Sequence, residues 1–307
     1  MNKNLVFISG ITGFVGQNMH TFLAKNYDVK GISRQENQNN FSYSLFIENK
    51  INFDAIIHLA GKAHDLKKVS DPEEYYEANY ELTKKIFDVF LFSNASVFIF
   101  MSSVKAVADE VEGVLNENFI PNPKTHYGIS KLQAENYILN QKLPEGKRVY
   151  ILRPCMIHGP GNKGNLNLLY LIVSKGFPWP LGSFHSKRSF LSIDNLSFVV
   201  KELLENNLIP SGIYQVSDDV PLSTNSVIQI LSTSISKKSR VLNIPTLWIK
   251  LFAVLGDYLH LPLNSERLQK LTENYVVSNN KIVTAIGKSL PTQSKEGLLK
   301  TFQSFKK

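Results

Sequence analysis

A glycine-containing turn between an apolar strand and an amphipathic helix is the feature that most constrains what this chain can fold into. In "LVFISGITGFVGQNMHTFL" (residues 5–23), Gly10, Gly13 and Gly16 follow an apolar run and open a helical pattern. The first glycine permits a tight turn, the second lets the backbone approach a pyrophosphate, and the third lets helix and strand pack closely. Because a helix N-terminus adds N–H donors and positive dipole, we predict a dinucleotide-binding turn rather than an ordinary glycine turn. Its expected contact residues are Gly10, Thr12, Gly13, Phe14, Val15 and Gly16.

Short apolar runs alternate with amphipathic stretches through the first half of the chain, which is typical of a parallel sheet with helices on both faces. The short polar segment 35–50 offers one further candidate strand. We expect an α/β fold: a doubly wound parallel sheet (Rossmann) with a smaller, mostly helical C-terminal substrate domain. The predicted strands are 5–9, 29–33, 55–60, 96–102, 148–153 and 213–217, and the predicted helices include 14–26, 72–92 and 127–141.

The texture of the sequence changes after Pro154, where "CMIHGPGNKGN" and "KGFPWPLGSFHSKRS" are rich in glycine and proline. Such stretches favour loops around a substrate pocket over a clean linker. We therefore predict a dinucleotide-binding domain over 1–158, to which 186–217 returns, and a substrate-binding domain made of 159–185 and 218–307.

Composition narrows the classes of partner. The formal net charge is +8 over 307 residues, but the basic residues are dispersed, which disfavours a nucleic-acid partner. The single cysteine, Cys155, excludes an internal disulfide framework and fits a reducing compartment. The seven histidines show no metal-ligand spacing, so we predict no metal site, and we expect His158 to cap a loop.

No segment reaches the roughly 20 apolar residues that span a bilayer, and the N-terminal apolar run is too short for a signal peptide. We therefore expect a cytoplasmic protein. The most membrane-like segment is "PTLWIKLFAVLGDYLHLP" at 245–262. Its apolar spacing suits either membrane contact or a buried helix, and we favour the buried helix.

The end of the second predicted strand bears on the choice of dinucleotide. A carboxylate there accepts hydrogen bonds from the adenosine ribose, whereas "VKGISRQ" places Ser33 and Arg34 at this point. A carboxylate would repel a ribose 2′-phosphate, but a hydroxyl and a guanidinium can bind it. We therefore predict NADP, with NAD as the alternative; the other interpretation of Arg34 is a solvated side chain.

Two segments, "YELTK" (80–84) and "YGISK" (127–131), place a lysine four positions after a tyrosine. On a helix, both spacings bring the ammonium beside the phenol. Tyr127 follows Ser103 by 24 residues, and Ser103 comes directly after the apolar strand "SVFIFMS" (96–102). Because the carboxyl ends of such strands face the nicotinamide, we select Tyr127 and Lys131 and assign the other pair to helix packing.

These motifs together resemble the extended short-chain dehydrogenase/reductases that act on nucleotide sugars, within the NAD-dependent epimerase/dehydratase family. Weaker matches, "SKRSFLSIDNL" and "YQVSDDVPLS", extend the resemblance over nearly the whole chain. The stretch "GPGNKGNLNLLYLIVSKGFPWPLG" is similar to the bacterial nucleotide-sugar 4-epimerases and 4-ketoreductases of surface polysaccharide synthesis. The matching motifs, in family order, are "GITGFVG", "IIHLAGKAH", "EANYELTKK", "FIFMSSVK", "YGISK" and "LRPCMIHGPG".

The resemblance implies roles for the matched positions. Tyr127 would be the general acid/base, Lys131 would bind the nicotinamide ribose and depress the phenol pKa from about 10, and Ser103 would hydrogen-bond the reacting sugar oxygen. Two cations, Arg267 and Lys270, both suit a uridine contact, and the choice between them stays open. The implied cofactor pocket continues through Leu59, Ala60, Gly61, Lys62, Asn79 and Pro154. The implied substrate contacts are His64, Lys105, Met156, Asn165 and Arg188, the last at a diphosphate-binding position.

Three functions follow as hypotheses. The first is a 4-ketoreductase of a UDP-linked 4-keto-6-deoxy-N-acetylhexosamine that uses NADPH, with Tyr127 as the proton donor. The second is a UDP-hexose 4-epimerase acting on UDP-glucose or UDP-N-acetylglucosamine with tightly bound NAD. The third is a non-catalytic cofactor sensor or scaffold, which the intact Ser103, Tyr127 and Lys131 disfavour. The resemblance also implies a homodimer formed through helices at 80–92 and 127–141.

Overall fold

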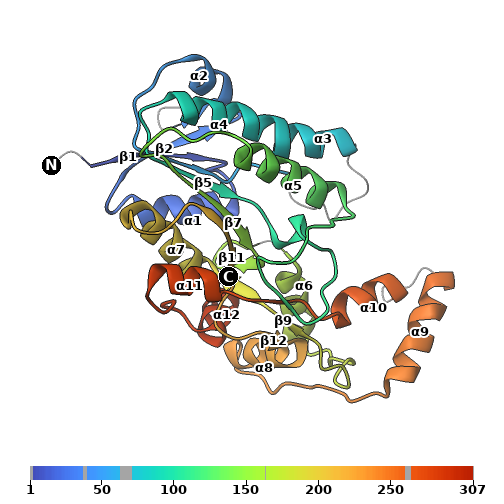
Figure 1. Ribbon diagram of the computed structural model, residues 1–307. Helices are drawn as coiled ribbons and strands as arrows, with labels where there is room; N and C mark the ends of the chain where they lie inside the picture. Colours follow the sequence, from blue (N-terminus) through green and yellow to red (C-terminus); the bar gives the residue numbers. More distant parts are fainter. Residues whose placement is uncertain (1–2, 37–39, 63–70, 163, 260–263, 307) are drawn as a thin grey trace.

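The computed structural model describes residues 3–36, 40–62, 71–162, 164–259 and 264–306, and of Lys270 only the backbone. A seven-stranded sheet in the order β3-β2-β1-β4-β5-β7-β11 forms its centre, and every neighbouring pair of strands is parallel (Figure 1). All the predicted strands are confirmed, as is the candidate within 35–50, which forms β3. The strands are β1 (Leu5–Ser9), β2 (Asp28–Ser33), β3 (Asn40–Ser42), β4 (Ala55–His58), β5 (Val97–Met101), β7 (Arg148–Pro154) and β11 (Gly212–Val216).

Helices cover both faces of the sheet, as the alternating pattern predicts (Figure 1). Successive side chains of a strand point to opposite faces. Val6 therefore packs in one cluster with Met19, while Phe7 packs in the other with Phe87. The first face carries α1 (Phe14–Leu23), α7 (Ile193–Glu205) and α11 (Asn280–Ile286). The second carries α2 (Tyr43–Glu48), α3 (Pro72–Tyr76), α4 (Leu82–Phe92) and α5 (His126–Leu139).

The predicted helix 72–92 is one continuous run interrupted by a π-helical turn at Glu77–Glu81, between α3 and α4. It starts because Asp71 caps the Glu73 amide at 3.1 Å and Pro72 occupies the first helical position. A π-turn accommodates an extra residue and often occurs at functional sites. Here it contains Asn79, whose side chain is fully buried.

A smaller, mostly helical region completes the chain and has its own apolar core around Trp179, Phe190, Leu231 and Phe302. Short strand pairs join it to the central sheet region. Residues Val104–Ala106, after β5, form a 3₁₀ turn. Its helices are α6 (Asn165–Ser174), α8 (Thr224–Ser234), α9 (Thr246–Leu259), α10 (Ser265–Thr272) and α12 (Ser294–Gln303). The paired strands are β8 (Met156–His158) with β10 (Phe190–Ser192), β9 (Lys187–Arg188) with β12 (Leu222–Ser223), and β6 (Val114–Leu115) with β13 (Val276–Val277).

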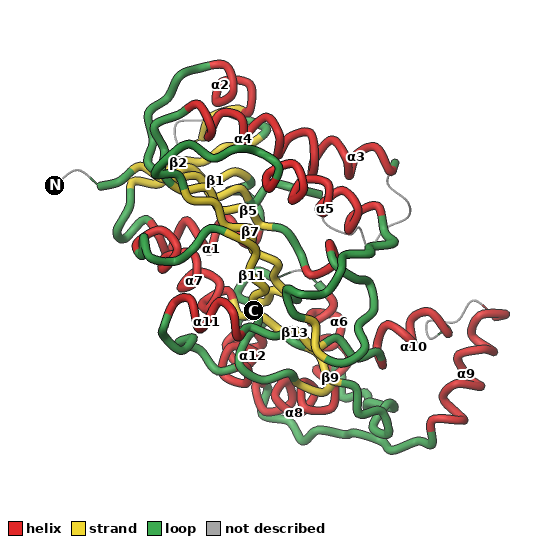
Figure 2. Tube along the Cα trace, in the orientation of Figure 1, coloured by secondary structure: helices red, strands yellow, loops and turns green. Residues whose placement is uncertain are grey.

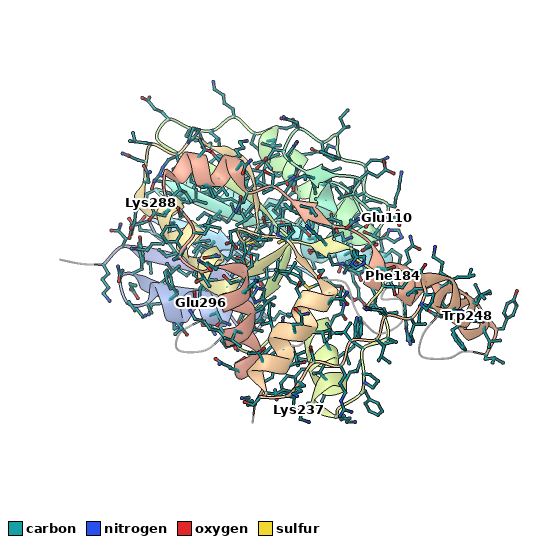
Figure 3. The ribbon with its side chains drawn as sticks, turned by 90° about the horizontal axis from the view of Figure 1, so that it is seen from below. Glu110, Phe184, Lys237, Trp248, Lys288 and Glu296 are labelled. Atoms are coloured by element: carbon teal, nitrogen blue, oxygen red, sulfur yellow. The ribbon has the colours of Figure 1, made fainter. Side chains whose placement is uncertain are left out.

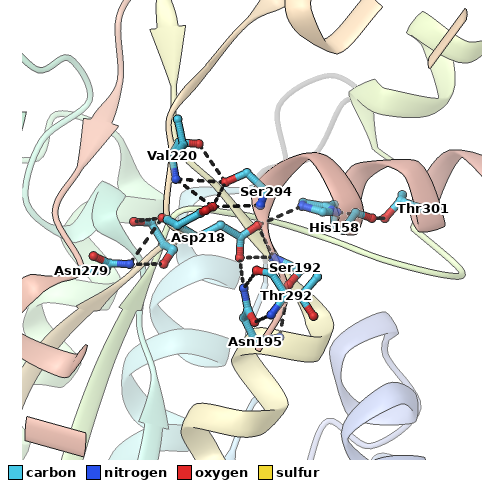
Figure 4. A network of polar contacts seen from close by, with 12 residues as sticks. His158, Ser192, Asn195, Asp218, Val220, Asn279, Thr292, Ser294 and Thr301 are labelled. Atoms are coloured by element: carbon cyan, nitrogen blue, oxygen red, sulfur yellow. Dashed lines mark hydrogen bonds and ion pairs between the residues drawn. The ribbon is translucent and has the colours of Figure 1, made fainter. Parts of the chain in front are cut away.

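A buried polar network joins these elements (Figure 4). The Asp218 carboxylate accepts the Ser192 amide at 3.0 Å and the Asn195 amide group at 2.6 Å. His158, predicted to cap a loop, instead lies fully buried in this network, with Nδ1 2.9 Å from the Thr301 hydroxyl and Nε2 3.5 Å from Asp218. The network therefore fixes β8, α7 and α12 to the end of β11.

Within the segment 245–262, residues Thr246–Leu259 form the predicted helix, α9, but the prediction that this helix is buried is wrong. Trp248 is 57% exposed and Tyr258 is 79% exposed. Figures 1 and 2 show α9 at the edge of the molecule, beyond α10. An apolar pattern reports a helix's preference for burial, not whether the chain supplies a covering surface. Among the described residues, no helix is long and apolar enough to cross a membrane.

Candidate functional site

The glycine turn leaves β1 and opens α1 with its N-terminal amides uncapped by any side chain. Gly10 has a φ of +72°, and a Cβ there would lie 2.9 Å from the Ala60 backbone. A Cβ at Gly16 would overlap the Gly10 carbonyl. Both positions therefore require glycine, which has no side chain. Gly13 is the N-cap, and the first turn of α1 contains no acidic residue. These features fit a pyrophosphate, which would meet N–H donors and the positive helix end.

The end of β2 places Arg34 on the surface beside Tyr43, the first residue of α2. Burial raises the pKa of Tyr43, while the Arg34 charge and a backbone hydrogen bond from Gly10 oppose this rise. Ser33 is buried, and its hydroxyl donates to the Gln35 carbonyl at 2.6 Å. That hydrogen is therefore already used within the protein. Sequence reasoning missed Tyr43 because the polar 35–50 segment carries no motif.

The loop after β4 is held against α5 by the buried Asn79. The Lys62 amide donates to Asn79 Oδ1 at 2.8 Å, and Asn79 Nδ2 donates to the Lys62 carbonyl at 3.1 Å and to Ser130 Oγ at 3.0 Å. A Cβ at Gly61 would lie 2.6 Å from Asn79 Oδ1 and 3.0 Å from Lys131 Nζ. Gly61, Asn79 and Lys131 therefore meet at one point, with Leu59 and the buried Ala60 preceding them on the loop.

Ser103, Tyr127 and Lys131 gather at the carboxyl end of β5. Tyr127 lies in the first turn of α5, which the Thr125 hydroxyl caps by accepting the Gly128 amide at 3.2 Å. The Ser103 hydroxyl lies close enough to the Tyr127 phenol to influence its pKa. Lys131 Nζ donates to the carbonyl of Met101, the last residue of β5, at 2.9 Å. The structure thus brings together the three residues selected from the sequence.

Burial controls the ionisation of this group. It raises the pKa of Tyr127 above its ordinary value, and the Ser103 hydroxyl opposes the rise. Burial also lowers the pKa of Lys131 to about 8, against the opposing charge of Glu135. The expected depression of the phenol pKa by the lysine does not contribute to this shift in the protein alone. Tyr127 holds its proton at neutral pH and is suited to donate it.

Beneath this group lie Glu135 and Arg153, which the sequence analysis missed. Arg153 Nε donates to the two Glu135 carboxylate oxygens at 3.0 and 3.1 Å, and the Ser102 hydroxyl also donates to this carboxylate. Both charged side chains are almost completely buried. The available signal was position, because Glu135 lies four residues after Lys131 on the same face of α5.

The competing pair behaves as predicted and serves helix packing. Lys84 lies 5.0 Å from the centre of the Tyr80 ring and 5.6 Å from that of Tyr137 on α5. Its ammonium also pairs with Glu81 at 3.3 Å. Tyr80 and Lys84 thus tie neighbouring helices together, away from the serine-ended strand.

Two predicted substrate residues, Lys105 and Arg188, lie in one charged cluster. Burial lowers the pKa of Lys105, and the positive charge of Arg188 acts in the same direction. Lys105 Nζ donates to the Asp109 carbonyl at 2.6 Å and lies 4.4 Å from the centre of the Tyr275 ring. Arg188 pairs with Glu273, the residue after α10, at 3.0 Å. The carboxylates of Glu273, Asp109 and Glu110 act on Lys105 in the opposite direction, so the two cations lie among three acidic side chains.

The other predicted positions are more dispersed. Pro154 is buried at the end of β7, Met156 is half-buried on β8, and Asn165 is exposed at the first position of α6. His64 lies outside the described residues. Arg267 is exposed on α10, whereas the side chain of Lys270 is outside the described part, so the choice between them stays open. Within the described part, no group of three or more His, Cys, Asp or Glu side chains could hold a metal ion.

Known proteins resemble this chain over most of its length. A UDP-glucose 4-epimerase from Vibrio cholerae is 29% identical over 98% of this chain and 95% of that protein. An N-acetyl-alpha-D-glucosaminyl-diphospho-ditrans,octacis-undecaprenol 4-epimerase from Escherichia coli O157:H7 is 26% identical over 80% of this chain and 76% of that protein. The structure of UDP-N-acetylglucosamine 4-epimerase from Bacillus cereus matches with a TM-score of 0.76 at 19% identity, over 97% of this chain and 98% of that one, and supports the fold.

The sequence pattern of one family covers most of the sheet-forming part of the chain. It matches residues 6–217, from β1 to the residue after β11, and so contains the glycine turn and the Ser103–Tyr127–Lys131 group. The family has NAD-dependent chemistry, which agrees with the uncapped glycine turn. The chain belongs to the NAD dependent epimerase/dehydratase family.

Proposed function

We propose that the protein reduces the 4-keto group of a UDP-linked 4-keto-6-deoxy-N-acetylhexosamine with NADPH. The observation that carries this choice is Arg34, which lies at the end of β2 beside Tyr43 and near Gly10. A guanidinium at this position can bind a ribose 2′-phosphate, and a freely exchanging reductant is usually NADPH. The protonated state of Tyr127 supports the direction, because reduction of a ketone consumes a proton.

The chain's own residues act on the sugar oxygen. When bound, the reduced cofactor supplies the hydride that forms the new C–H bond at C4. The electron pair of the C=O π bond then moves to oxygen, and the Tyr127 phenol transfers its proton there. The Ser103 hydroxyl, which lies beside the Tyr127 phenol, orients the oxygen and stabilises its developing charge. Lys131 provides positive charge near the phenol and, with Asn79 and Gly61, shapes the cofactor side of the pocket.

We assign the diphosphate of the substrate to the charged cluster of Lys105 and Arg188. His64, Met156 and Asn165 are proposed to line the sugar pocket, and the predicted division into a dinucleotide-binding and a nucleotide-sugar-binding domain is retained. A cytoplasmic homodimer formed through α4 and α5 is part of the same proposal. The cysteine thiol of Cys155 is buried, which is compatible with a reducing compartment.

A UDP-hexose 4-epimerase is the second candidate, favoured by the name of the Vibrio cholerae relative that aligns with nearly the whole chain. The same three residues would serve it, with Tyr127 acting first as base and then as acid. The name of the Escherichia coli relative adds a hexosamine carried on a polyprenyl diphosphate as another form of substrate. A non-catalytic sensor is disfavoured because Ser103, Tyr127 and Lys131 lie together.

The nucleotide carried by the freshly purified protein, and its fate, test these alternatives. We expect the purified protein to carry no nucleotide and to consume NADPH when the UDP-linked 4-keto sugar is added. NADPH use is measured by absorbance, and the sugar products are identified after separation. Tightly bound NAD, interconversion of UDP-N-acetylglucosamine with its 4-epimer and no net NADPH use would overturn the reductase in favour of the epimerase. If the protein converted neither the UDP-linked 4-keto sugar nor UDP-N-acetylglucosamine, both the reductase and the epimerase would be contradicted.

A further inference from the structure

The exposed face of α9 is an apolar surface that the proposed chemistry does not use. Eight apolar or aromatic side chains of this 14-residue helix are exposed. Trp248 lies at the outer edge of the molecule in Figure 3. Monomeric proteins rarely leave so contiguous an apolar surface uncovered unless it binds something. The eight are Leu247, Trp248, Leu251, Phe252, Val254, Leu255, Tyr258 and Leu259.

The helix has a narrow inner seam and a broad outer face. Its buried residues, Ile249, Ala253 and Gly256, recur at helical spacing, and the first two share an apolar cluster with Leu268 of α10. The polar residues Thr246, Lys250 and Asp257 fall within about 40° of one another at 3.6 residues per turn. Almost all the remaining circumference is apolar. One neighbouring helix therefore covers only the seam.

The positive charge of the chain favours an anionic partner, and α9 itself carries one exposed cation, Lys250. Between residues 236 and 259 the chain carries four cations and one carboxylate, and the whole chain has a net charge of +8. The carboxylate, Asp257, is already bound by the Ser265 hydroxyl and amide, at 2.5 and 3.1 Å. The cations are Lys237, Lys238, Arg240 and Lys250, all exposed. The first three line a surface pocket whose apolar walls include Val173, Phe177 and Ile228.

We propose that α9 lies in the headgroup region of a lipid bilayer rich in anionic lipids, with its apolar face inserted and the body of the protein in water. Exposed tryptophan and tyrosine suit this interface because their rings are apolar with a polar edge. At about 1.5 Å per residue the helix is about 20 Å long, which suits lying in the interface. A second copy of the chain fits less well, since both copies carry the same net positive charge of +8.

The proposed membrane surface is connected to the substrate side of the molecule. α10 follows α9 and packs against its seam. Gln269 of α10 donates to Glu110 at 2.8 Å, and Glu273 after α10 pairs with Arg188 at 3.0 Å. Docking of α9 would therefore place the cluster that we assign to a diphosphate near the lipid headgroups. The membrane proposal rests on neither choice of reaction and is tested without turnover.

Vesicle cosedimentation of the full chain tests the proposal. We expect the protein to sediment with vesicles of equal parts phosphatidylcholine and phosphatidylglycerol, less with phosphatidylcholine alone, and less in high salt. The double variant Phe252→Glu/Leu255→Glu should lower the partition coefficient by about tenfold or more. Because these side chains are 58% and 47% exposed, the variant should fold, as checked by its circular dichroism and thermal midpoint.

The matched control is Leu208→Glu, an apolar side chain that is 84% exposed on the loop before β11, far in the chain from α9. It should bind vesicles as the wild type does. Failure of the wild type to bind either vesicle, or equal binding by the double variant, would overturn the proposal. A third outcome is a wild-type protein that does not bind vesicles and is a dimer by light scattering, with a double variant that is a monomer. That result would overturn the membrane proposal and identify α9 as an interface between copies.

Discussion

The Glu135 carboxylate and the Arg153 guanidinium form an ion pair inside the protein, with Arg153 Nε 3.0 and 3.1 Å from the two carboxylate oxygens. The pair joins α5, which carries Tyr127 and Lys131, to β7 of the central sheet. Its carboxylate also accepts the Ser102 hydroxyl and raises the pKa of Lys131 against the effect of burial. Two charges far from the surface therefore set the position of the proposed catalytic helix.

Removal of one partner should leave an uncompensated charge in the interior. We expect Arg153→Met to reduce the free energy of unfolding by about 3–5 kcal/mol, measured by urea titration. Glu296→Gln, which breaks an exposed pair with Lys300 at 3.3 Å, should change it by no more than about 0.5 kcal/mol. Similar effects of the two substitutions would show that the interior pair is not desolvated.

The proposed proton donor should be separable from its decoy. Tyr127→Phe should lower kcat by about 10²–10⁴-fold with cofactor binding retained, whereas Tyr80→Phe should leave kcat unchanged. Burial raises the pKa of Tyr127 and lowers that of Lys131 to about 8. Ketone reduction should therefore hold through neutral pH and decline above about pH 8 as Lys131 loses its charge. Unchanged turnover in Tyr127→Phe would refute the assignment.

The cofactor preference should depend on Arg34. In Arg34→Ala we expect the dissociation constant for NADPH to rise about tenfold or more and that for NADH to change little, because only NADPH carries the 2′-phosphate. Calorimetric or fluorescence titration measures both. Lys25→Ala removes an exposed cation just beyond α1 and should affect neither. An unchanged ratio in Arg34→Ala would remove the case for NADP.

Substrate affinity should depend on Arg188 and not on its neighbour. Arg188→Met should raise KM for the UDP-sugar by about tenfold or more while kcat changes less, since a diphosphate is held in both ground and transition states. Lys187→Met, an exposed cation beside it on β9, is the matched control. A loss confined to kcat would move Arg188 from diphosphate binding to another role.

His58 should make the protein sensitive to acid. It is fully buried, with Nδ1 2.5 Å from the Ser9 hydroxyl and Nε2 2.9 Å from that of Thr83, and burial lowers its pKa to about 3. Since an unfolded histidine titrates near about 6.5, its contribution is complete above that pH and is lost as the pH falls toward 3. The urea midpoint should fall across this window, and less steeply in His58→Gln. The exposed His20→Gln should follow the wild type.

The sheet and the central group could be predicted from the sequence because their signals are local. The apolar runs define the strands, and the serine-ended strand selects Tyr127 over Tyr80. Glu135 and Arg153 carry no such signal: a glutamate and an arginine 18 residues apart become partners only when α5 packs on β7. Tyr43 likewise reaches Arg34 only through the sheet order.

The burial of α9 could not be predicted for a related reason. Helical spacing of Ile249 and Ala253 identifies the seam, but Trp248 and Phe252 follow the same apolar pattern and are exposed. Whether such a face is covered depends on elements distant in the sequence. The direction of the Tyr127 pKa shift could not be predicted for the same reason. Burial by distant elements, and not the neighbouring lysine, dominates the shift.

The π-turn at Glu77–Glu81 rotates the two segments of the long helix, α3 and α4, relative to each other. An extra residue in one turn rotates the preceding segment by about 100° relative to the following one. On one side Tyr75 meets the Tyr127 ring at 6.5 Å, and on the other Phe87 packs against Phe98 at 4.9 Å. Deleting a single residue from the turn would therefore yield a more regular helix but a misaligned one: it could keep its core contacts or its contact with Tyr127, and not both.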